Sequence, residues 1–216
     1  MESNLTIYKA SDQLLSIELR LLDLQKKGIP IVESYYIPKG TKKTLAEIHE
    51  NLNWSETVIK PTVSGAARHT YRLNPTNYTK HEKLFATLIQ QEDFVLQPFQ
   101  KNVPKKGEVS HIVIGGKYSH SILKLAKKGD YRVQDDHGGT IHPYTATKTE
   151  INLAEHCTKA CTTLPIYARV DLIWNNTDEL VLIELELIEP ELWFRKNTTA
   201  AYQLADTIFS TYFNKE

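Results

Sequence analysis

Three carboxylates near the end of the chain have a spacing that suits a metal site. Asp171 lies in the apolar run 166–174, and Glu184 and Glu186 lie in the next one. Residues two apart on a strand face the same side, and the turn 175–178 can fold both strands into a hairpin that brings Asp171 beside the glutamates. Carboxylates gathered on an apolar strand need a cation, and all-oxygen ligands suit Mg²⁺ or Mn²⁺. The alternative is a solvated polar face, which many antiparallel strands have.

Arg169 stands two residues before Asp171, so it is expected on the same strand face. A fixed guanidinium beside a metal and phosphates can stabilise a developing oxyanion. On the sequence alone, Arg169 can equally form a salt bridge to one of the two glutamates.

A lysine and a loop of small residues suggest phosphate binding earlier in the chain. Lys60 ends an expected strand and is followed by Ser64, Gly65 and Ala66. Backbone N–H groups of such a loop can surround phosphates, although the GxxxxGK[ST] pattern is absent. A single lysine at a strand end is also an ordinary solvated residue.

A second stretch could hold a nucleoside. The apolar strand 94–97 leads into Gln97, Pro98 and Phe99, whose free backbone groups could read an adenine edge. Glu108 could accept hydrogen bonds from ribose hydroxyls.

Alternating periodicities predict the elements that position these residues. Helices are expected over 11–27, 45–51, 77–91, 147–162 and 198–213, and strands over 29–37, 57–60, 68–73, 94–97, 109–114, 117–125, 166–174 and 180–188. Helices alternate with strands early and antiparallel hairpins dominate late, which favours an α+β fold with two lobes. We predict an N-terminal helical segment over 1–29, a small lobe over 30–98 and a large lobe over 99–216.

Composition excludes several classes of function. The 216 residues contain 26 Lys plus Arg and 26 Asp plus Glu, so no nucleic-acid affinity is expected. No signal peptide and no run of membrane-spanning length is visible. Cys157 and Cys161 lie four apart in an expected helix, which predicts buried thiols and a cytoplasmic protein rather than a disulfide scaffold. A zinc site with His156 is the alternative, but its spacing matches no common zinc pattern.

Taken together, the features resemble the ATP-grasp superfamily of ligases, from about residue 14 to the C-terminus. D-alanine–D-alanine ligases space their metal-binding Asp, Glu and Asn by thirteen and two residues. Asp171, Glu184 and Glu186 have the same separations, and Arg169 occupies the Arg-x-Asp position.

The sequence is also similar to a bacterial ATP-grasp group related to glutathione synthetases and the ribosomal-protein glutamate ligase. This group includes the enzyme that closes the ring of D-cycloserine. The stretches that carry the resemblance are Gly107-Glu108-Val109-Ser110, Tyr118-Ser119-His120-Ser121, Gly129 to Gln134, His137-Gly138-Gly139, and Glu184 to Pro190.

The resemblance implies an ATP-grasp fold, with ATP bound between two α+β lobes. The ATP-binding residues implied by it are Lys60, Ser64, Gly65, Ala66, Gln97, Pro98, Phe99 and Glu108. The implied metal ligands are Asp171, Glu184 and Glu186, of which Glu186 replaces the commoner Asn. The implied catalytic residues are Lys124 and Arg132, which face the transferred phosphate or the acid, and Arg169.

Two departures from the family pattern affect these expectations. Most ATP-grasp enzymes carry a preceding domain that completes the substrate site, and we expect none in this chain, because Met1 lies almost at the start of the ATP-grasp portion. A fragment, a naturally short protein and half of a split enzyme are the alternatives. The lysine that often reaches ATP from the first helix is also missing, and Glu18 or Arg20 stands in that region.

The predicted function is an ADP-forming ligase that activates a carboxylate as an acyl phosphate for attack by an amine or a similar nucleophile. Its predicted cofactors are ATP and Mg²⁺, with Mn²⁺ as the alternative. Expected partners are small carboxylates and amines, without nucleic acid or membrane, together with either a second copy or a separate N-terminal domain. A non-catalytic ATP-binding module or half of a split ligase is the rival prediction. A metal-dependent phosphodiesterase explains the three carboxylates but not Lys60 or Glu108.

Overall fold

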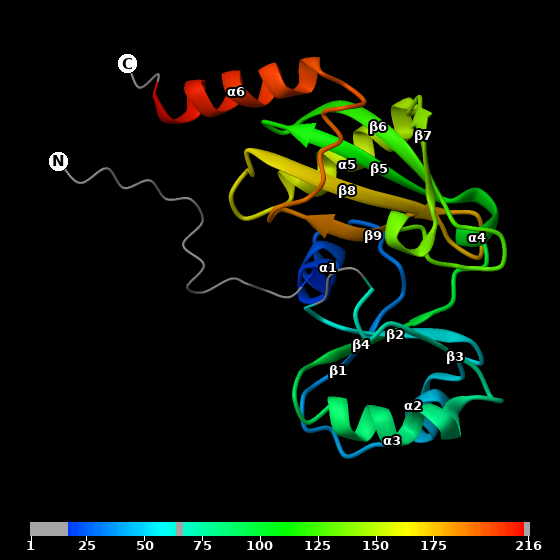
Figure 1. Cartoon of the computed structure of the whole chain (residues 1–216). Coiled ribbons are helices and arrows are strands. Elements are labelled where there is room, and N and C mark those ends of the chain that lie inside the picture. Colours follow the sequence, from blue (N-terminus) through cyan, green and yellow to red (C-terminus); the bar gives the residue numbers. More distant parts are fainter. Residues whose placement is uncertain (1–16, 64–66, 214–216) are drawn as a thin grey trace.

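Two antiparallel sheets, joined by a linker near residue 99, organise the chain (Figure 1). The computed structural model describes residues 17–63 and 67–213. One sheet has four strands in the order β1-β4-β2-β3, and the other has five in the order β7-β6-β5-β8-β9. Each sheet has its own helices and hydrophobic core, so the predicted α+β architecture with two lobes is confirmed.

The smaller sheet carries two helices on one face. Its strands are β1 (Tyr35–Ile37), β2 (Thr57–Pro61), β3 (Tyr71–Leu73) and β4 (Phe94–Pro98), and its helices are α2 (Leu45–Leu52) and α3 (Tyr78–Leu88). Alternate residues of β2 are buried, as expected for a strand with one face against a core. Helix α2 begins with a capping box formed by Thr44 and Glu47, which satisfies two N–H groups at its start.

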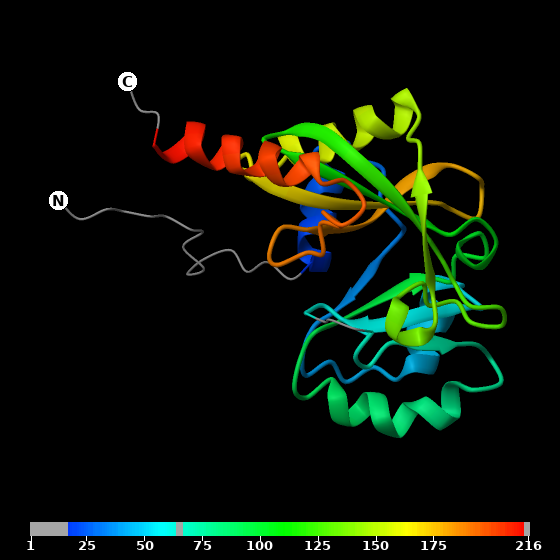
Figure 2. The same cartoon turned by 45° about the horizontal axis from the view of Figure 1, so that its top comes forward.

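The larger sheet is covered on both faces. Its strands are β5 (Glu108–Ile114), β6 (Lys117–Leu125), β7 (Thr140–Tyr144), β8 (Tyr167–Trp174) and β9 (Leu180–Glu186). Helices α1 (Ile17–Lys26) and α5 (Lys148–Lys159) pack on one face, and α6 (Thr199–Tyr212) lies near the end of the other (Figure 2). Every residue of the central strand β5 is buried in consequence.

Most predicted elements are present, with some ends shifted in either direction and some additions. The additions are helix α4 (Val103–Lys106), strand β7 and a 3₁₀ turn at Asp135–His137. Only 35–37 of the expected strand 29–37 belongs to a sheet. The strand expected from residue 68 begins at Tyr71, because Ala67 and His69 have positive φ values of 56° and 52°.

The N-terminal helix packs with the larger sheet rather than standing apart. Leu21, Leu24 and Ile29 belong to the core cluster that includes residues of β8 and β9. The first six residues of the expected helix 11–27 lie outside the described part of the chain. The predicted division into segments 1–29, 30–98 and 99–216 stays a prediction.

In the described ranges, no helix combines the length and apolarity that a bilayer crossing requires.

Gly107 provides a test of how tightly the start of β5 is packed against β6. Its φ is +81°, and an added Cβ would lie 2.4 Å from the backbone oxygen of Lys124. Gly40 has a similar φ of +78° with nothing within 4 Å. We expect Gly40→Ala to cost about 1–2 kcal/mol for the left-handed conformation alone. Gly107→Ala should cost at least about 2 kcal/mol more in urea unfolding, because the steric clash is added. Equal losses would contradict this packing.

His111 makes the stability of the larger sheet sensitive to acid. It lies on the β5 face covered by α5, where burial lowers its pKa to about 4 despite the nearby Glu150. The unfolded state therefore binds more protons as the pH falls from about 6.5 toward 4, and the folded state loses stability over that range. His111→Asn should reduce the change in unfolding free energy between pH 7 and pH 5 by roughly 2 kcal/mol. His156→Asn, at an exposed position of α5, is the control, and its unfolding free energy should change between pH 7 and pH 5 as that of the wild type does.

Candidate active site

The hairpin of β8 and β9 brings the three carboxylates together. Asp171 lies opposite Glu184, and Arg169 lies opposite Glu186. Ligand oxygens of the three acids all lie within 4.8 Å of one another. The predicted hairpin and the shared face are therefore confirmed. A bulge at Ile183 shifts the pairing beyond this point, so the register that aligns the acids holds only at this end of the hairpin.

Neighbouring strands add a lysine, a glutamate and a serine to the same face. In β5 and β6, Glu108 lies opposite Lys124, and Ser110 lies opposite Asp171 of β8. The Lys124 ammonium pairs with the Glu108 carboxylate and lies 3.2 Å from Asp171 Oδ2. Ser110 Oγ donates a 2.5 Å hydrogen bond to Asp171 Oδ1. Ser110 is not among the predicted site residues, although strand alternation from Glu108 places it on this face.

Arg169 is shared among all three acids. Its Nε donates to both Asp171 oxygens at 3.0 and 3.1 Å, and its Nη2 lies 2.9 Å from Asp171 Oδ2. It also pairs with Glu186, and its Nη2 lies 3.7 Å from Glu184. The salt-bridge alternative for Arg169 is thus realised here, and it places the guanidinium where it could also act on an oxyanion.

The charges of this face are strongly coupled. Burial opposes ionisation of Asp171, yet Arg169 and Lys124 hold the pKa of its carboxyl well below the usual range. Burial and the neighbouring Glu184 raise the pKa of Glu186 to about 8. Burial also disfavours the charged form of Lys124, but Asp171 and Glu108 outweigh it and raise the lysine pKa to about 12.

When all four of its acids are ionised, this face has two negative charges in excess of its two cations, and a bound cation would favour that ionised state. The four acids are Glu108, Asp171, Glu184 and Glu186, and the cations are Lys124 and Arg169. The Asp171 side chain is fully buried, whereas those of Glu184 and Glu186 are 26% and 22% exposed. Two partly exposed carboxylates beside a buried one form an open, all-oxygen donor set. This donor set fits Mg²⁺, which keeps some positions for water and phosphates.

Trp193 covers the two cations. The distance from its ring centroid is 5.5 Å to Arg169 Cζ and 5.8 Å to Lys124 Nζ. Its side chain packs with Ile112 and Ile122, which lie on the same sheet face as the charged cluster. Nothing in the periodicity of the sequence marked this tryptophan, because it lies in the irregular segment between β9 and α6 and has a φ of +46°.

The predicted ATP-binding residues of the first lobe lie on β2 and β4. Lys60 of β2 pairs with Val95 of β4. Gln97 is buried and donates from Nε2 to Ser34 Oγ at 2.8 Å, and Pro98 ends the strand. Ser64, Gly65 and Ala66 lie outside the described residues, as do the side chains of Glu18 and Arg20.

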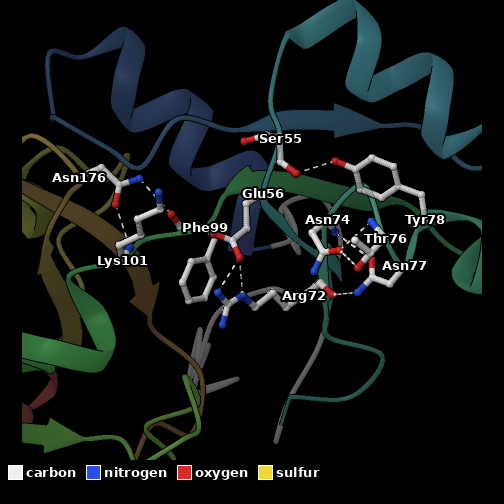
Figure 3. Close-up of polar contacts among 10 residues, drawn as sticks. All are labelled: Ser55, Glu56, Arg72, Asn74, Thr76, Asn77, Tyr78, Phe99, Lys101 and Asn176. Atoms are coloured by element: carbon white, nitrogen blue, oxygen red, sulfur yellow. Dashed lines mark hydrogen bonds and ion pairs between the residues drawn. The ribbon is translucent and has the colours of Figure 1, made fainter.

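Phe99 connects the two lobes through its backbone (Figure 3). Its N–H donates to the Glu56 carbonyl at 2.8 Å in the first lobe, and its carbonyl accepts from Asn176 Nδ2 at 2.9 Å in the second. Its ring lies under the Arg72 guanidinium at 3.7 Å and meets Tyr131 edge to face. The Phe99 N–H is therefore occupied, whereas its carbonyl oxygen keeps a second lone pair that could accept from an adenine amino group.

Arg132 is placed apart from the charged cluster. It pairs with Asp130 at 2.8 Å and lies beside Tyr131. Within the described ranges it forms no ion pair with the acids of β5, β8 or β9. Its predicted catalytic role, like the roles of the other residues, stays a prediction.

The zinc alternative finds no support. Among the described residues, the only group of three side chains able to share a metal is Asp171, Glu184 and Glu186. Cys157 lies on the inner face of α5 and is fully buried, and neither it nor Cys161 forms a disulfide. The prediction of buried thiols holds for Cys157.

Comparisons with known proteins agree on one family. Residues 10–207 match the model of a RimK-like ATP-grasp domain. The cycloserine biosynthesis protein DcsG of Streptomyces lavendulae is 25% identical over 207 residues, which cover 87% of this chain and 67% of that protein.

Solved structures show the same fold. The D-cycloserine synthetase DcsG superposes with a TM-score of 0.80 at 23% identity, over 92% of this chain and 70% of that one. D-alanine–D-alanine ligase from Bacillus anthracis gives 0.67 at 18% identity, over 92% and 67%. The ATP-grasp ligase PsnB, in a complex with a precursor, Mg and ADP, gives 0.63 at 13% identity, over 90% and 59%.

The coupled charges predict a large difference between two acid-to-amide substitutions. Asp171→Asn leaves Arg169 and Lys124 without their shared buried counter-ion, which should lower the free energy of unfolding by about 3–5 kcal/mol in EDTA. Glu184→Gln removes a partly exposed acid from an overall negative cluster, so it should change stability by less than about 1 kcal/mol. Urea unfolding of both variants tests this, and similar losses for the two would contradict the assignment of Asp171 as the central counter-ion.

Proposed function

This chain belongs to the RimK-like ATP-grasp family and is an ATP-dependent ligase of the carboxylate–amine class; we propose that the acids of β8 and β9 bind the metal that carries its ATP. The observation that carries this proposal is the convergence of Asp171, Glu184 and Glu186 on one sheet face, beside two buried cations. Bound Mg²⁺, or Mn²⁺ in its place, would neutralise phosphate charge as a phosphoryl group moves to a carboxylate.

The two cations would bind the reacting oxygens. Lys124 and Arg169 are held in fixed positions by Asp171, so they need little reorganisation when negative charge develops. We assign Arg169 to the oxyanion of the tetrahedral intermediate and Lys124 to the transferred phosphoryl group or the acid. Glu108 is occupied by Lys124, so a role at ribose would require it to leave that partner. Arg132 would reach the acid from its loop.

The nucleotide would lie against the first lobe and the linker. Lys60 and residues 64–66 are proposed to contact phosphates. Gln97, Pro98 and Phe99 are proposed to contact the adenine. The hydrogen bonds of the Phe99 backbone to both lobes also fix how the lobes meet, and this alignment brings the reactants together.

Small molecules are the proposed substrates. DcsG and the D-alanine ligase are named for small amino-acid products, which favours a small acid and an amine or a similar nucleophile here. A cytoplasmic location is proposed because both cysteines lack disulfides.

A direct test incubates the full chain with Mg-ATP and a panel of amino and hydroxy acids, with and without amines, and measures ADP. Acid-dependent ADP formation is the expected result. Tight Mg-ATP binding without turnover on any member of a broad panel would support the rival, a nucleotide-binding module without ligase chemistry.

Glu184→Gln should abolish most ADP formation while leaving the fold intact, because the metal site loses one of its three charges. We expect kcat/KM for ADP formation to fall by at least about 100-fold relative to the wild type. The matched control is Glu179→Gln, an exposed acid of the β8–β9 turn that keeps an acceptor for Asn175. Circular dichroism checks the fold of both. Full activity in Glu184→Gln would refute the metal assignment.

A further inference from the structure

The loop between β6 and β7 carries Arg132 and reaches toward the smaller lobe. In Figures 1 and 2 this loop, drawn in yellow-green, extends from the larger sheet toward the smaller one. Within it, the Tyr131 ring meets the ring of Phe99 edge to face, with the ring centroids 5.8 Å apart and the planes at 80°. Tyr131 therefore connects a loop of the larger lobe to the linker between the lobes.

The Phe99 ring is itself held by the smaller lobe. The Arg72 guanidinium of β3 lies over this buried ring, with Cζ 3.7 Å from the ring centroid (Figure 3). Glu56 bonds to both partners: its carboxylate accepts from Arg72 Nε at 3.0 Å, and its carbonyl accepts from the Phe99 N–H at 2.8 Å. Arg72 and Glu56 thus restrict the ring, so Tyr131 packs against a side chain in a fixed position.

Asp130 joins Tyr131 and Arg132 into one compact unit. Its Oδ1 accepts from the backbone N–H groups of both residues, at 2.7 and 3.0 Å, and from Arg132 Nε at 3.1 Å. Its Oδ2 accepts from Arg132 Nη2 at 2.8 Å. The same guanidinium lies 5.9 Å from the centroid of the Tyr131 ring. A displacement of Tyr131 would therefore displace Arg132 with it.

The half-buried side chain of Tyr131 lies near charges from both lobes. Burial raises the pKa of Tyr131, whereas the guanidinium groups of Arg132, in the larger lobe, and Arg72, in the smaller lobe, lower it. Loop residues that a rigid scaffold holds in place often carry function. The contacts of Tyr131 thus connect the candidate adenine site at the linker to a candidate catalytic arginine.

We propose that Tyr131 is a positioning residue that couples occupancy of the adenine site to the position of Arg132. This inference rests on the proposed function, in which the adenine lies at the linker and Arg132 reaches the acid. An adenine at the linker would further restrict the Phe99 ring, and with it Tyr131 and Arg132. The acid would then meet an ordered arginine once ATP is bound, in a site that already holds the other reactant.

The proposed coupling acts in both directions. A loop that adenine orders must strengthen nucleotide binding by the same factor, which is typically roughly 5–150-fold. Because Tyr131 contacts the linker rather than the metal site, this gain depends on the base of the nucleotide. A phosphate compound without a base would bind at the metal site and leave the loop as it is in the free protein.

Hydrogen exchange of the full chain tests the proposal, with Mg-ADP as the probe and calorimetry to measure its binding. Saturating Mg-ADP should slow exchange of the amides of residues 129–134 by at least about 5-fold. Mg-pyrophosphate, which lacks the base, should not slow it. Tyr131→Leu should lose the protection by Mg-ADP and bind it more weakly, whereas Tyr131→Phe keeps the ring contact with Phe99 and should behave as the wild type does.

A double-mutant cycle separates positioning of Arg132 from a general structural role. In acid-dependent ADP formation, Tyr131→Leu should lower kcat/KM for the acid by at least about 10-fold in the wild type. Arg132→Lys keeps the charge but loses the forked pairing with Asp130. In that background Tyr131→Leu should cost less than about 2-fold, because the two residues act as a unit. Fully additive losses would contradict the proposal.

The outcomes distinguish this inference from the function on which it rests. Failure of the wild type to bind Mg-ADP would refute the proposed function itself. Binding of Mg-ADP without protection of residues 129–134 would overturn only the role of Tyr131. Equal protection by Mg-pyrophosphate, or protection that survives in Tyr131→Leu, would overturn it as well, because the loop would then respond to something other than adenine at the linker.

Discussion

The buried ion network on the larger sheet is the constraint on which the rest of the site depends. Lys124 and Arg169 share Asp171, whose side chain is fully buried. A buried charge without a partner costs several kcal/mol, so none of the three can be moved alone. Strand registers fix their positions, and the remaining acids, Glu184 and Glu186, face a common point with excess negative charge. Lys124 and Arg169 are thus positioned to bind oxyanions, and Glu184 and Glu186 are positioned to bind a cation.

The linker between the two lobes has little conformational freedom at Phe99. Phe99 bonds to Glu56 on one side and to Asn176 on the other, and Arg72 covers its ring. A nucleotide between the sheets would therefore be held by lobes whose linker is already ordered. In the larger lobe, the segment between β9 and α6 carries Trp193, which covers both cations and packs with Ala200 at the start of α6.

Local pattern was enough to predict the two-lobed α+β fold and the convergence of the acids, because side-chain alternation and a tight turn fix both. The network around Asp171 was less accessible. Ser110 could have been found by alternation from Glu108, but the pairing of Glu108 with Lys124 depends on the register between β5 and β6. Trp193 could not have been found, since an irregular segment with positive φ leaves no periodic signal. Strand β7, with its proline, and the four-residue helix α4 were too short or too irregular to predict.

The most direct measurement is a crystal structure of the full chain with Mg²⁺ and a non-hydrolysable ATP analogue. We predict a metal ion bonded to oxygens of Asp171, Glu184 and Glu186 and to the terminal phosphates, with the adenine near Gln97, Pro98 and Phe99. Metal and phosphates bound elsewhere, with the three acids still paired only to Arg169 and Lys124, would contradict it.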